Sequence, residues 1–195
     1  MRRVIGIGET ILDILFKNNQ PTVAVPGGSV FNGLVSLGRA GANVTFISEV
    51  GGDRVGDIIL NFMKDNGIST DNVKVYPDRK SPISLAFLNE KNDAEYSFYK
   101  DYPSLRLDVD MPEVTSEDIV MFGSFYAITP QLRDKVKELL DKAREAGAII
   151  YYDVNFRSTH AHEAIKLMPT ILENFEYADI VRGSNEDFGY MFGMT

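Results

Sequence analysis

Short apolar runs alternate along the chain with longer amphipathic segments. The runs are rich in valine, isoleucine and aromatic residues and cover residues 4–8, 43–50, 118–123, 148–154 and 178–183. Most are almost continuously apolar, which is typical of strands covered by helices on both faces of a sheet. The segments between them predict helices over residues 29–40, 55–66, 130–146 and 161–176. We therefore expect an α/β fold around a mostly parallel sheet.

The interval 83–102 departs from this alternation. ISLAFLN and AEYSFYKDY are strand-like runs separated by the polar sequence EKND at 90–93, so a β-hairpin is predicted within the α/β scheme. Its aromatic residues fit either closure over a sugar or a small core or dimer contact; they are Tyr96, Phe98, Tyr99 and Tyr102.

The longest predicted helix has clear ends. Thr129 is a candidate N-cap, Pro130 suits the first helical position, and Gly147 lies just beyond the last turn. Its apolar stripe predicts that this face packs in the core; the stripe comprises Leu132, Val136, Leu139, Leu140 and Ala143.

Composition narrows the functional class. The chain has 195 residues, 44% hydrophobic and 25% charged, with a formal net charge of −8. The acidic balance disfavours nucleic acid as a partner, since binding to phosphates needs clustered lysine and arginine. The absence of cysteine excludes disulfides. No apolar run reaches the length of a membrane span, so we expect a cytoplasmic protein that does not bind membranes.

The first strand-like run ends in two carboxylates. In GIGETILD (6–13) the third glycine of a dinucleotide fingerprint is replaced by Ile11, and the chain contains no Walker sequence. Glu9 and Asp13 follow the carboxyl end of the strand, where parallel sheets bind ligands. Asp13 therefore fits either a ligand-binding carboxylate that accepts hydrogen bonds from hydroxyls or a solvent-facing turn residue.

The stretch PGGSVFNGLVSLGRAG (26–41) opens the first predicted helix. Gly27 and Gly28 allow a tight turn or the close approach of a ligand, and Ser29 can cap the helix. Asn32 lies off the apolar stripe in the first turns, where its amide fits either recognition of a polyol or local capping. Two further glycines, Gly33 and Gly38, suit close packing of this helix.

Two later segments also place polar groups at strand ends. Asp53 in GGDRVGD fits a helix N-cap and a ligand acceptor equally. In YYDVNFR (151–157), Asp153, Asn155 and Arg157 alternate along a chain expected to stay extended, which predicts a polar site, with a salt-bridged loop as the alternative. His160 and His162 match no zinc pattern and are expected at the surface.

In this order the segments resemble the PfkB, or ribokinase-like, family of carbohydrate kinases, and most of all its fructokinases. GETILD is similar to the family's GE-x-x-x-D, GGSVFNGLVSLGRAG to its GG-x-x-x-N signature, and GGDRVGD to its G-x-D-x-x-G segment. FGSF and DVNFR are similar to the fructokinase GS and D-x-N-x-R sequences. The resemblance spans nearly the whole chain.

The resemblance implies a ribokinase-like αβα sandwich over residues 1–195, with a small β lid formed from about 13–26 and 82–102. It implies that sugar hydroxyls contact residues of the opening motifs, namely Asp13, Gly27, Gly28 and Asn32. Phe98 and Lys100 look like lid residues facing the sugar, although fructokinases commonly have arginine in place of Lys100. The lid of this family often pairs subunits, so we expect a homodimer.

ATP and Mg²⁺ are the cofactors that the resemblance implies. Asp153, Asn155 and Arg157 would lie on the phosphate side, with Asn185 on the side of the nucleotide and the metal. Asn185 and Glu186 would act on Mg²⁺ indirectly. The family continues N-x-x-E where this chain has Phe188, which leaves the organisation of the metal site open.

The resemblance predicts an ATP-dependent sugar kinase whose sugar-binding half lies in these 195 residues. The family's later D-T-x-G-A-G-D motif, which carries the anion hole and the catalytic aspartate, is absent from them, so we expect the 195-residue chain alone to be inactive. A neutral sugar is favoured over a phosphosugar, because no lysine or arginine cluster accompanies Asp13 and Asn32. Ribose, nucleosides and 2-keto-3-deoxygluconate stay open as acceptors. The alternatives are a noncatalytic sugar-binding or regulatory protein and a structural α/β module.

Overall fold

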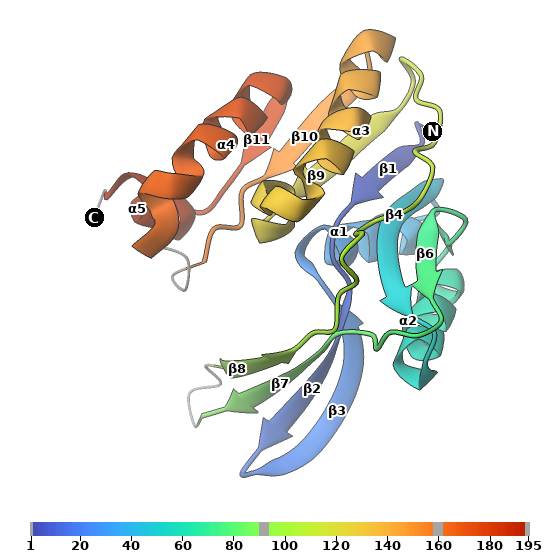
Figure 1. Cartoon of the computed structure of the whole chain (residues 1–195), viewed down its shortest axis with the longest axis vertical. Helices are drawn as coiled ribbons and strands as arrows, with labels where there is room; N and C mark the ends of the chain where they lie inside the picture. The colour runs from blue at the N-terminus through green and yellow to red at the C-terminus, as the bar shows by residue number, and fades with distance from the viewer. Residues whose placement is uncertain (1, 90–93, 158–161, 194–195) are drawn as a thin grey trace.

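The computed structural model describes residues 2–89, 94–157 and 162–193 and contains two sheets (Figure 1). The central sheet of this described part has seven strands. They are β1 (Val4–Ile7), β4 (Val44–Gly51), β5 (Ile68–Ser69), β6 (Val73–Tyr76), β9 (Ile119–Gly123), β10 (Ile149–Asp153) and β11 (Ile180–Arg182).

The central sheet is parallel throughout its described pairs. Its order is β11-β10-β9-β1-β4-β5, and β6 also pairs with β4. All residues of β1 and β4 are buried and those of β9 are buried or half-buried, as expected for strands covered on both faces. All five predicted strands are confirmed, and so is the expectation of an α/β fold around a mostly parallel sheet.

Helices cover both faces of this sheet. One core cluster joins it to α1 (Ser29–Arg39) and α2 (Arg54–Asp65), and the other joins it to α3 (Arg133–Ala146) and α4 (Ala164–Tyr177). These are the four predicted helices. The short α5 (Asn185–Phe192), which contacts α4, was not predicted. None of the helices in the described ranges is long and apolar enough to cross a membrane.

The start of α3 differs from its prediction. The chain first forms the short 3₁₀ segments η1 (Phe125–Ile128) and η2 (Pro130–Leu132), and α3 begins only at Arg133. Thr129 does not cap the helix, because its hydroxyl donates to the carbonyl of Phe125. The predicted apolar stripe is buried, and Gly147 ends the helix in the left-handed conformation as expected.

A second, small sheet has the order β3-β2-β7-β8. Its strands are β2 (Ile11–Lys17), β3 (Gln20–Gly27), β7 (Ile83–Leu88) and β8 (Ala94–Tyr99). The predicted hairpin is confirmed as the antiparallel pair β7 and β8, while its turn at 90–93 lies outside the described residues. We call these four strands the small sheet.

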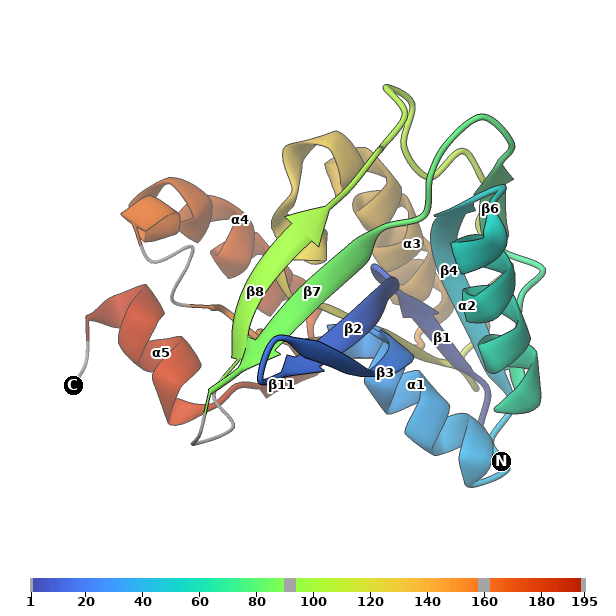
Figure 2. The same ribbon diagram turned by 90° about the horizontal axis from the view of Figure 1, so that it is seen from below.

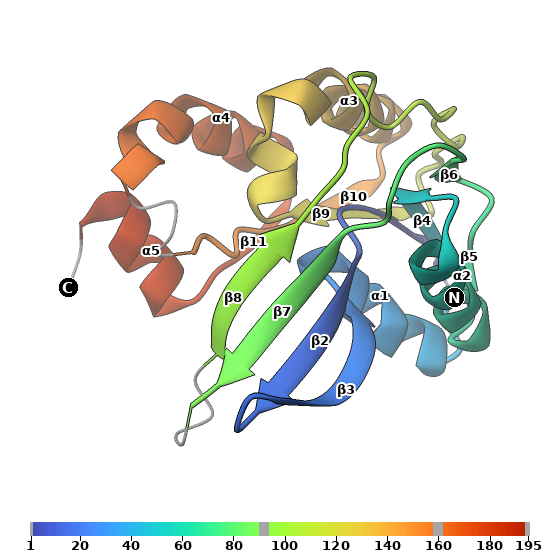
Figure 3. The ribbon, with the colours of Figure 1, turned by 60° about the horizontal axis from the view of Figure 1, so that its bottom comes forward.

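The small sheet projects from one end of the central sheet. The chain leaves β1 at Ile7 and enters the small sheet at Ile11, so the small sheet stands beyond the carboxyl end of β1. Figure 2 shows it from below, lying across that end of the molecule, and Figure 3 shows its four strands side by side. Ligand sites of parallel sheets form at this carboxyl edge.

Two glycines set how closely α1 approaches its neighbours. A side chain on Gly33 would meet only the flexible end of Met121, whereas one on Gly38 would collide with the backbone carbonyl of Asn66. The side chain of Met121 can move to make room, whereas the backbone of Asn66 cannot. The predicted role of both glycines in close packing is therefore confirmed, but a larger residue is tolerated far better at Gly33 than at Gly38.

We expect Gly38→Ala to lower the free energy of unfolding by about 1–3 kcal/mol, the usual cost of overpacking. Gly33→Ala is the matched control on the same helix. There, the higher helix propensity of alanine, worth up to about 1 kcal/mol, offsets the displacement of Met121. Urea unfolding of both variants checks this, and equal stability of the two would contradict it.

Candidate active site

One cross-strand row of the small sheet contains the carboxylate singled out in the sequence. Asp13 on β2 is paired with Val25 on β3 and with Ser84 on β7, and Ser84 is paired with Phe98 on β8. Paired residues point to the same face of a sheet. Asp13 and Phe98 therefore share one face, and Lys100 follows two residues later, directly after β8.

Asp13 is held on this face by a buried hydroxyl. Ser84, which is fully buried, donates from Oγ to Oδ1 of Asp13. Burial raises the pKa of Asp13 above its usual value, and the hydrogen bond from Ser84 opposes that rise. A side chain on Gly27 would collide with Oδ2 of Asp13, so glycine leaves room for the carboxylate. The structure thus brings Asp13 and Gly27 together.

Gly28 joins the small sheet to α1. It has a φ of 145°, and a side chain there would collide with the carbonyl of Glu9, so glycine is required both by conformation and by space. Gly28 occupies the N-cap of α1 itself, and Ser29 does not cap the helix as expected. One turn on, the backbone N–H of Asn32 donates to the carbonyl of Gly28 at 2.9 Å.

The side chain of Asn32 is exposed. Within the described part of the chain, its amide makes no side-chain hydrogen bond, so it does not serve as the local cap that the sequence left open. Its donor and acceptor are available to a ligand beside Gly28.

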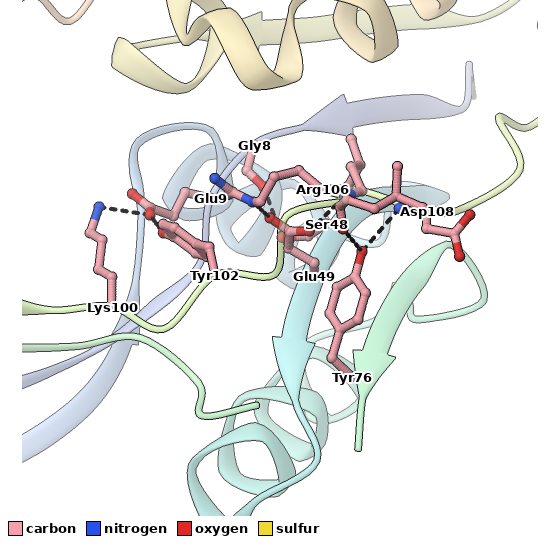
Figure 4. A network of polar contacts seen from close by, with 11 residues as sticks. Gly8, Glu9, Ser48, Glu49, Tyr76, Lys100, Tyr102, Arg106 and Asp108 are labelled. Carbon is pink, nitrogen blue, oxygen red and sulfur yellow. Dashed lines mark hydrogen bonds and ion pairs between the residues drawn. The ribbon is translucent and has the colours of Figure 1, made fainter. Parts of the chain in front are cut away.

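Two carboxylates, Glu9 and Glu49, lie at the carboxyl edge of the central sheet. The parallel pairing of β1 with β4 sets Ile7 opposite Ile47; Glu9 follows the end of β1, and Glu49 lies on β4. Each needs a cation or a donor, because a carboxylate withdrawn from water is costly unless it is paired. Both obtain them from residues 100–107, which we call the return segment because they lead from β8 back to the central sheet (Figure 4).

Glu9 binds the start of the return segment. Its Oε1 accepts from Nζ of Lys100 at 2.8 Å and from the hydroxyl of Tyr102. The ammonium of Lys100 also lies 5.3 Å from the centre of the Phe98 ring. Lys100 thus lies beside Phe98 of the small sheet while it is paired with Glu9, which follows β1 of the central sheet; Figure 4 shows the ion pair.

Glu49 binds the end of the return segment. It forms an ion pair with Arg106, and both side chains are less than a tenth exposed. Its other oxygen accepts from the backbone N–H of Leu107 at 2.7 Å. The guanidinium of Arg106 lies 3.5 Å from the centre of the Tyr102 ring, which links the two carboxylate clusters through a cation–π contact.

The polar residues after β10 form a second group. Asp153, nearly buried, accepts from Arg182 at the end of β11, at 3.1 Å. The chain does not stay extended as predicted, because Asn155 has a φ of 40°, a conformation that asparagine tolerates better than most residues. Arg157 is exposed. Hence Asp153 is paired, in agreement with the salt-bridged alternative, while Arg157 faces solvent.

The start of α5 lies beside this second group. Asn185 and Glu186 are exposed, whereas Asp187 is buried and forms a capping box with Ser184. In the described ranges, no three histidine, aspartate or glutamate side chains are grouped closely enough to hold a metal. No hydrogen bond or ion pair between described residues joins this group to Asp13 or Glu9.

Asp53 and His162 lie outside both polar groups. Asp53 is the N-cap of α2, accepting from Gly56, and also binds Ser81, so its structural interpretation is confirmed. His162 is exposed as expected, and His160 lies outside the described residues.

Residues 1–195 match the protein family described as "pfkB family carbohydrate kinase". The chain belongs to this family. The resemblance inferred from the order of the sequence motifs is therefore confirmed. The family motifs quoted from the sequence fall at the carboxyl edge of the central sheet and on the facing row of the small sheet.

Curated relatives in the pfkB family are fructokinases. The chain is 27% identical over 200 residues to a probable chloroplastic fructokinase-6 of Arabidopsis thaliana, covering 96% of this chain and 52% of the relative. It is 24% identical over 208 residues to fructokinase-1 of Oryza sativa subsp. japonica, covering 98% and 62%. The chain thus spans about half to three fifths of the length of these relatives.

Solved structures of sugar and riboside kinases show the same fold. A fructokinase double mutant from Vibrio cholerae O395, in its fructose, ADP and potassium bound form, has a TM-score of 0.84 at 20% identity, covering 100% of this chain and 64% of that one. Aminoimidazole riboside kinase from Salmonella enterica, complexed with aminoimidazole riboside and an ATP analogue, has a TM-score of 0.80 at 23% identity, covering 99% and 63%. The ribokinase-like αβα fold is thus shown.

Sequence reasoning missed the partners of the two edge carboxylates. Glu49 reads as part of a buried strand, and Arg106 lies 57 residues away in a polar connection without periodicity. Asp187 was passed over as well, although the sequence S-x-x-D at 184–187 signals a capping box. Only the last of these had a local signal.

We expect Asp13→Asn to raise the free energy of unfolding at pH 7. Burial raises the pKa of Asp13 in the folded protein above its unfolded value of about 3.9. Folding is then favoured most below the unfolded pKa, and stability is lost as pH rises through the folded pKa. The variant does not undergo this loss, so the free energies of unfolding of wild type and variant should become equal near pH 4. Urea unfolding between pH 4 and 7 tests this, and a variant less stable than wild type at pH 7 would contradict it.

Proposed function

We propose that the protein is a fructokinase-like sugar kinase, which transfers the terminal phosphoryl group of ATP to a hydroxyl of a neutral sugar in the cytoplasm. Membership in the pfkB family and the fructokinase relatives support the reaction class. The observation that carries the proposal is the Asp13 row, in which a carboxylate lies on one face of the small sheet against Gly27, at the strand end that leads into α1 and the unpaired amide of Asn32.

The sugar contacts follow from this arrangement. Asp13 accepts hydrogen bonds from sugar hydroxyls, and Asn32 supplies one donor and one acceptor, a combination that orients a polyol. Gly27 leaves room for the carboxylate of Asp13, and Gly28 lets the chain pass the carbonyl of Glu9 into α1. Phe98, more than half exposed, packs against the apolar face of the sugar, and Lys100 stands at its edge. The small sheet is then the lid over this site.

The phosphate side lies in the second group. Arg157 and the exposed guanidinium of Arg182 attract phosphate, while Asp153 holds Arg182 in place and Asn155 turns the chain between them. Asn185 and Glu186 offer amide and carboxylate oxygens in an exposed position, which suits a Mg²⁺ ion that keeps several of its waters. When bound, ATP supplies the phosphoryl group and Mg²⁺ neutralises its charge.

The base that takes the proton from the sugar hydroxyl is expected in the family's D-T-x-G-A-G-D motif, which these 195 residues do not contain. Phosphoryl transfer depends on positioning together with charge stabilisation, and the residues described here supply the positioning of the sugar. We therefore propose that the 195-residue polypeptide, assayed by itself, binds sugar without phosphorylating it.

A homodimer through the small sheet is part of the proposal. The face that contains Asp13 also exposes several large apolar side chains; they are Val23, Val25, Tyr96 and Phe98. Exposed apolar patches of this kind commonly mark protein interfaces.

We expect the natural-length protein to convert D-fructose and Mg-ATP to a sugar phosphate and ADP. Asp13→Ala and Asn32→Ala should each weaken sugar binding by about 10- to 100-fold, the loss expected for hydrogen bonds to a charged or buried partner. Calorimetric titration and a coupled ADP assay measure both effects. Lys17→Ala on β2 and Ser36→Ala on α1 are controls that leave binding unchanged.

Sugar binding without ADP formation in the natural-length protein would instead assign it to the noncatalytic sugar-binding class. Unchanged binding in both Asp13→Ala and Asn32→Ala, with the fold intact by circular dichroism, would contradict the proposed site.

Association through the small sheet should be sensitive to charge on its exposed face. We expect Val23→Lys to shift the protein from dimer to monomer in sedimentation velocity at micromolar concentration. Ile58→Lys on α2, a similarly exposed position, is the matched control and should leave the dimer intact. A monomeric wild type would overturn this part of the proposal.

A further inference from the structure

The ion pair between Glu9 and Lys100 lies at the proposed sugar site and determines the charge that a ligand meets there. Lys100 is the cation that accompanies Asp13 and Phe98, and its ammonium is 2.8 Å from Oε1 of Glu9. The two side chains are 33% and 29% exposed, so a ligand entering from solvent meets the pair rather than an isolated ammonium. The charge that Lys100 offers to a ligand is therefore already compensated.

Glu9 is held in this position from its other side. The hydroxyl of Tyr102 donates to the same oxygen that binds Lys100, and the ring of Tyr102 lies against the guanidinium of Arg106. Arg106 is in turn paired with the buried Glu49 (Figure 4). The buried pair thus anchors Tyr102, and Tyr102 orients Glu9. Glu9 cannot follow Lys100 toward a ligand without losing this hydrogen bond.

A sugar and the corresponding sugar acid meet this arrangement differently. A neutral sugar can accept a hydrogen bond from Lys100 and leave the ion pair intact. A carboxylate on the sugar must compete with Glu9 for the ammonium and approach both Glu9 and Asp13, which repel it. An unpaired lysine at the same place would attract that carboxylate instead.

We propose that Glu9 is a specificity-determining residue, which neutralises Lys100 and so makes the site select neutral sugars over sugar acids. The inference rests on the proposed function, because it assumes that the face containing Asp13, Phe98 and Lys100 binds the sugar. Glu9 acts through Lys100 and is a positioning residue in that sense, with the return segment as its support.

The test compares D-fructose with 2-keto-D-gluconate, which has a carboxylate in place of the first hydroxymethyl group of fructose. In the natural-length protein, Glu9→Gln removes the charge and keeps an oxygen that can accept from Tyr102. We expect the ratio of kcat/KM for fructose to kcat/KM for the acid to fall at least tenfold, with the gain for the acid appearing in KM. Calorimetric titration of both compounds measures the same change without turnover.

Two further variants separate specificity from a structural role. Tyr102→Phe loosens Glu9 but keeps its charge, so it should lower both efficiencies and change their ratio by less than about threefold. Lys100→Met leaves Glu9 unpaired, so rejection of the acid should become stronger and the ratio should rise. The double variant Glu9→Gln with Lys100→Met should lose the gain for the acid.

The outcomes distinguish this inference from the proposed function. A wild type that phosphorylates fructose, with the ratio unchanged in Glu9→Gln and Lys100→Met, would overturn the specificity role and leave the kinase assignment standing. A wild type that binds neither compound would overturn both. If Glu9→Gln does not fold, the rise of the ratio in Lys100→Met decides the question, because loss of a structural contact would lower both efficiencies together.

Discussion

The parallel pairing of β1 with β4 on one side and β9 on the other is the constraint on which the site depends. It brings the carboxyl ends of three strands to one edge, and Glu9 and Glu49 lie at or just beyond the ends of two of them. The return segment pairs both carboxylates, through Lys100, Tyr102 and Arg106. These contacts tie the small sheet to the central sheet.

Much of the fold could be predicted from the sequence because its signals are local. Continuously apolar runs marked the buried parallel strands, and the stripe on α3 marked its buried face. The contacts between distant segments could not be predicted in this way. Arg106 and Glu49 are 57 residues apart, and Lys100 and Glu9 are 91 apart, without any periodicity that links them. The conformation of Asn155 could not be predicted for a different reason. Alternating polar residues are typical of an extended strand, and nothing in the sequence indicated that the backbone turns at this residue.

The candidate site combines costs to stability that a purely structural protein would avoid. Burial raises the pKa of Asp13, Gly28 adopts a conformation that other residues disfavour, and Phe98 is exposed on a sheet. Features of this kind cluster at functional sites, where binding of a ligand offsets them. They fall on the residues that the family motifs had singled out, whereas Asp53, equally ambiguous in the sequence, proved to be an ordinary helix cap.

The most direct measurement is a crystal structure of the natural-length protein with D-fructose. The account predicts sugar hydroxyls within hydrogen-bonding distance of Asp13 and Asn32, the ring beside Phe98, and Lys100 still paired with Glu9. Fructose bound elsewhere, or bound without contact to Asp13, would contradict the assignment of the small sheet and the carboxyl edge as the two halves of the sugar site.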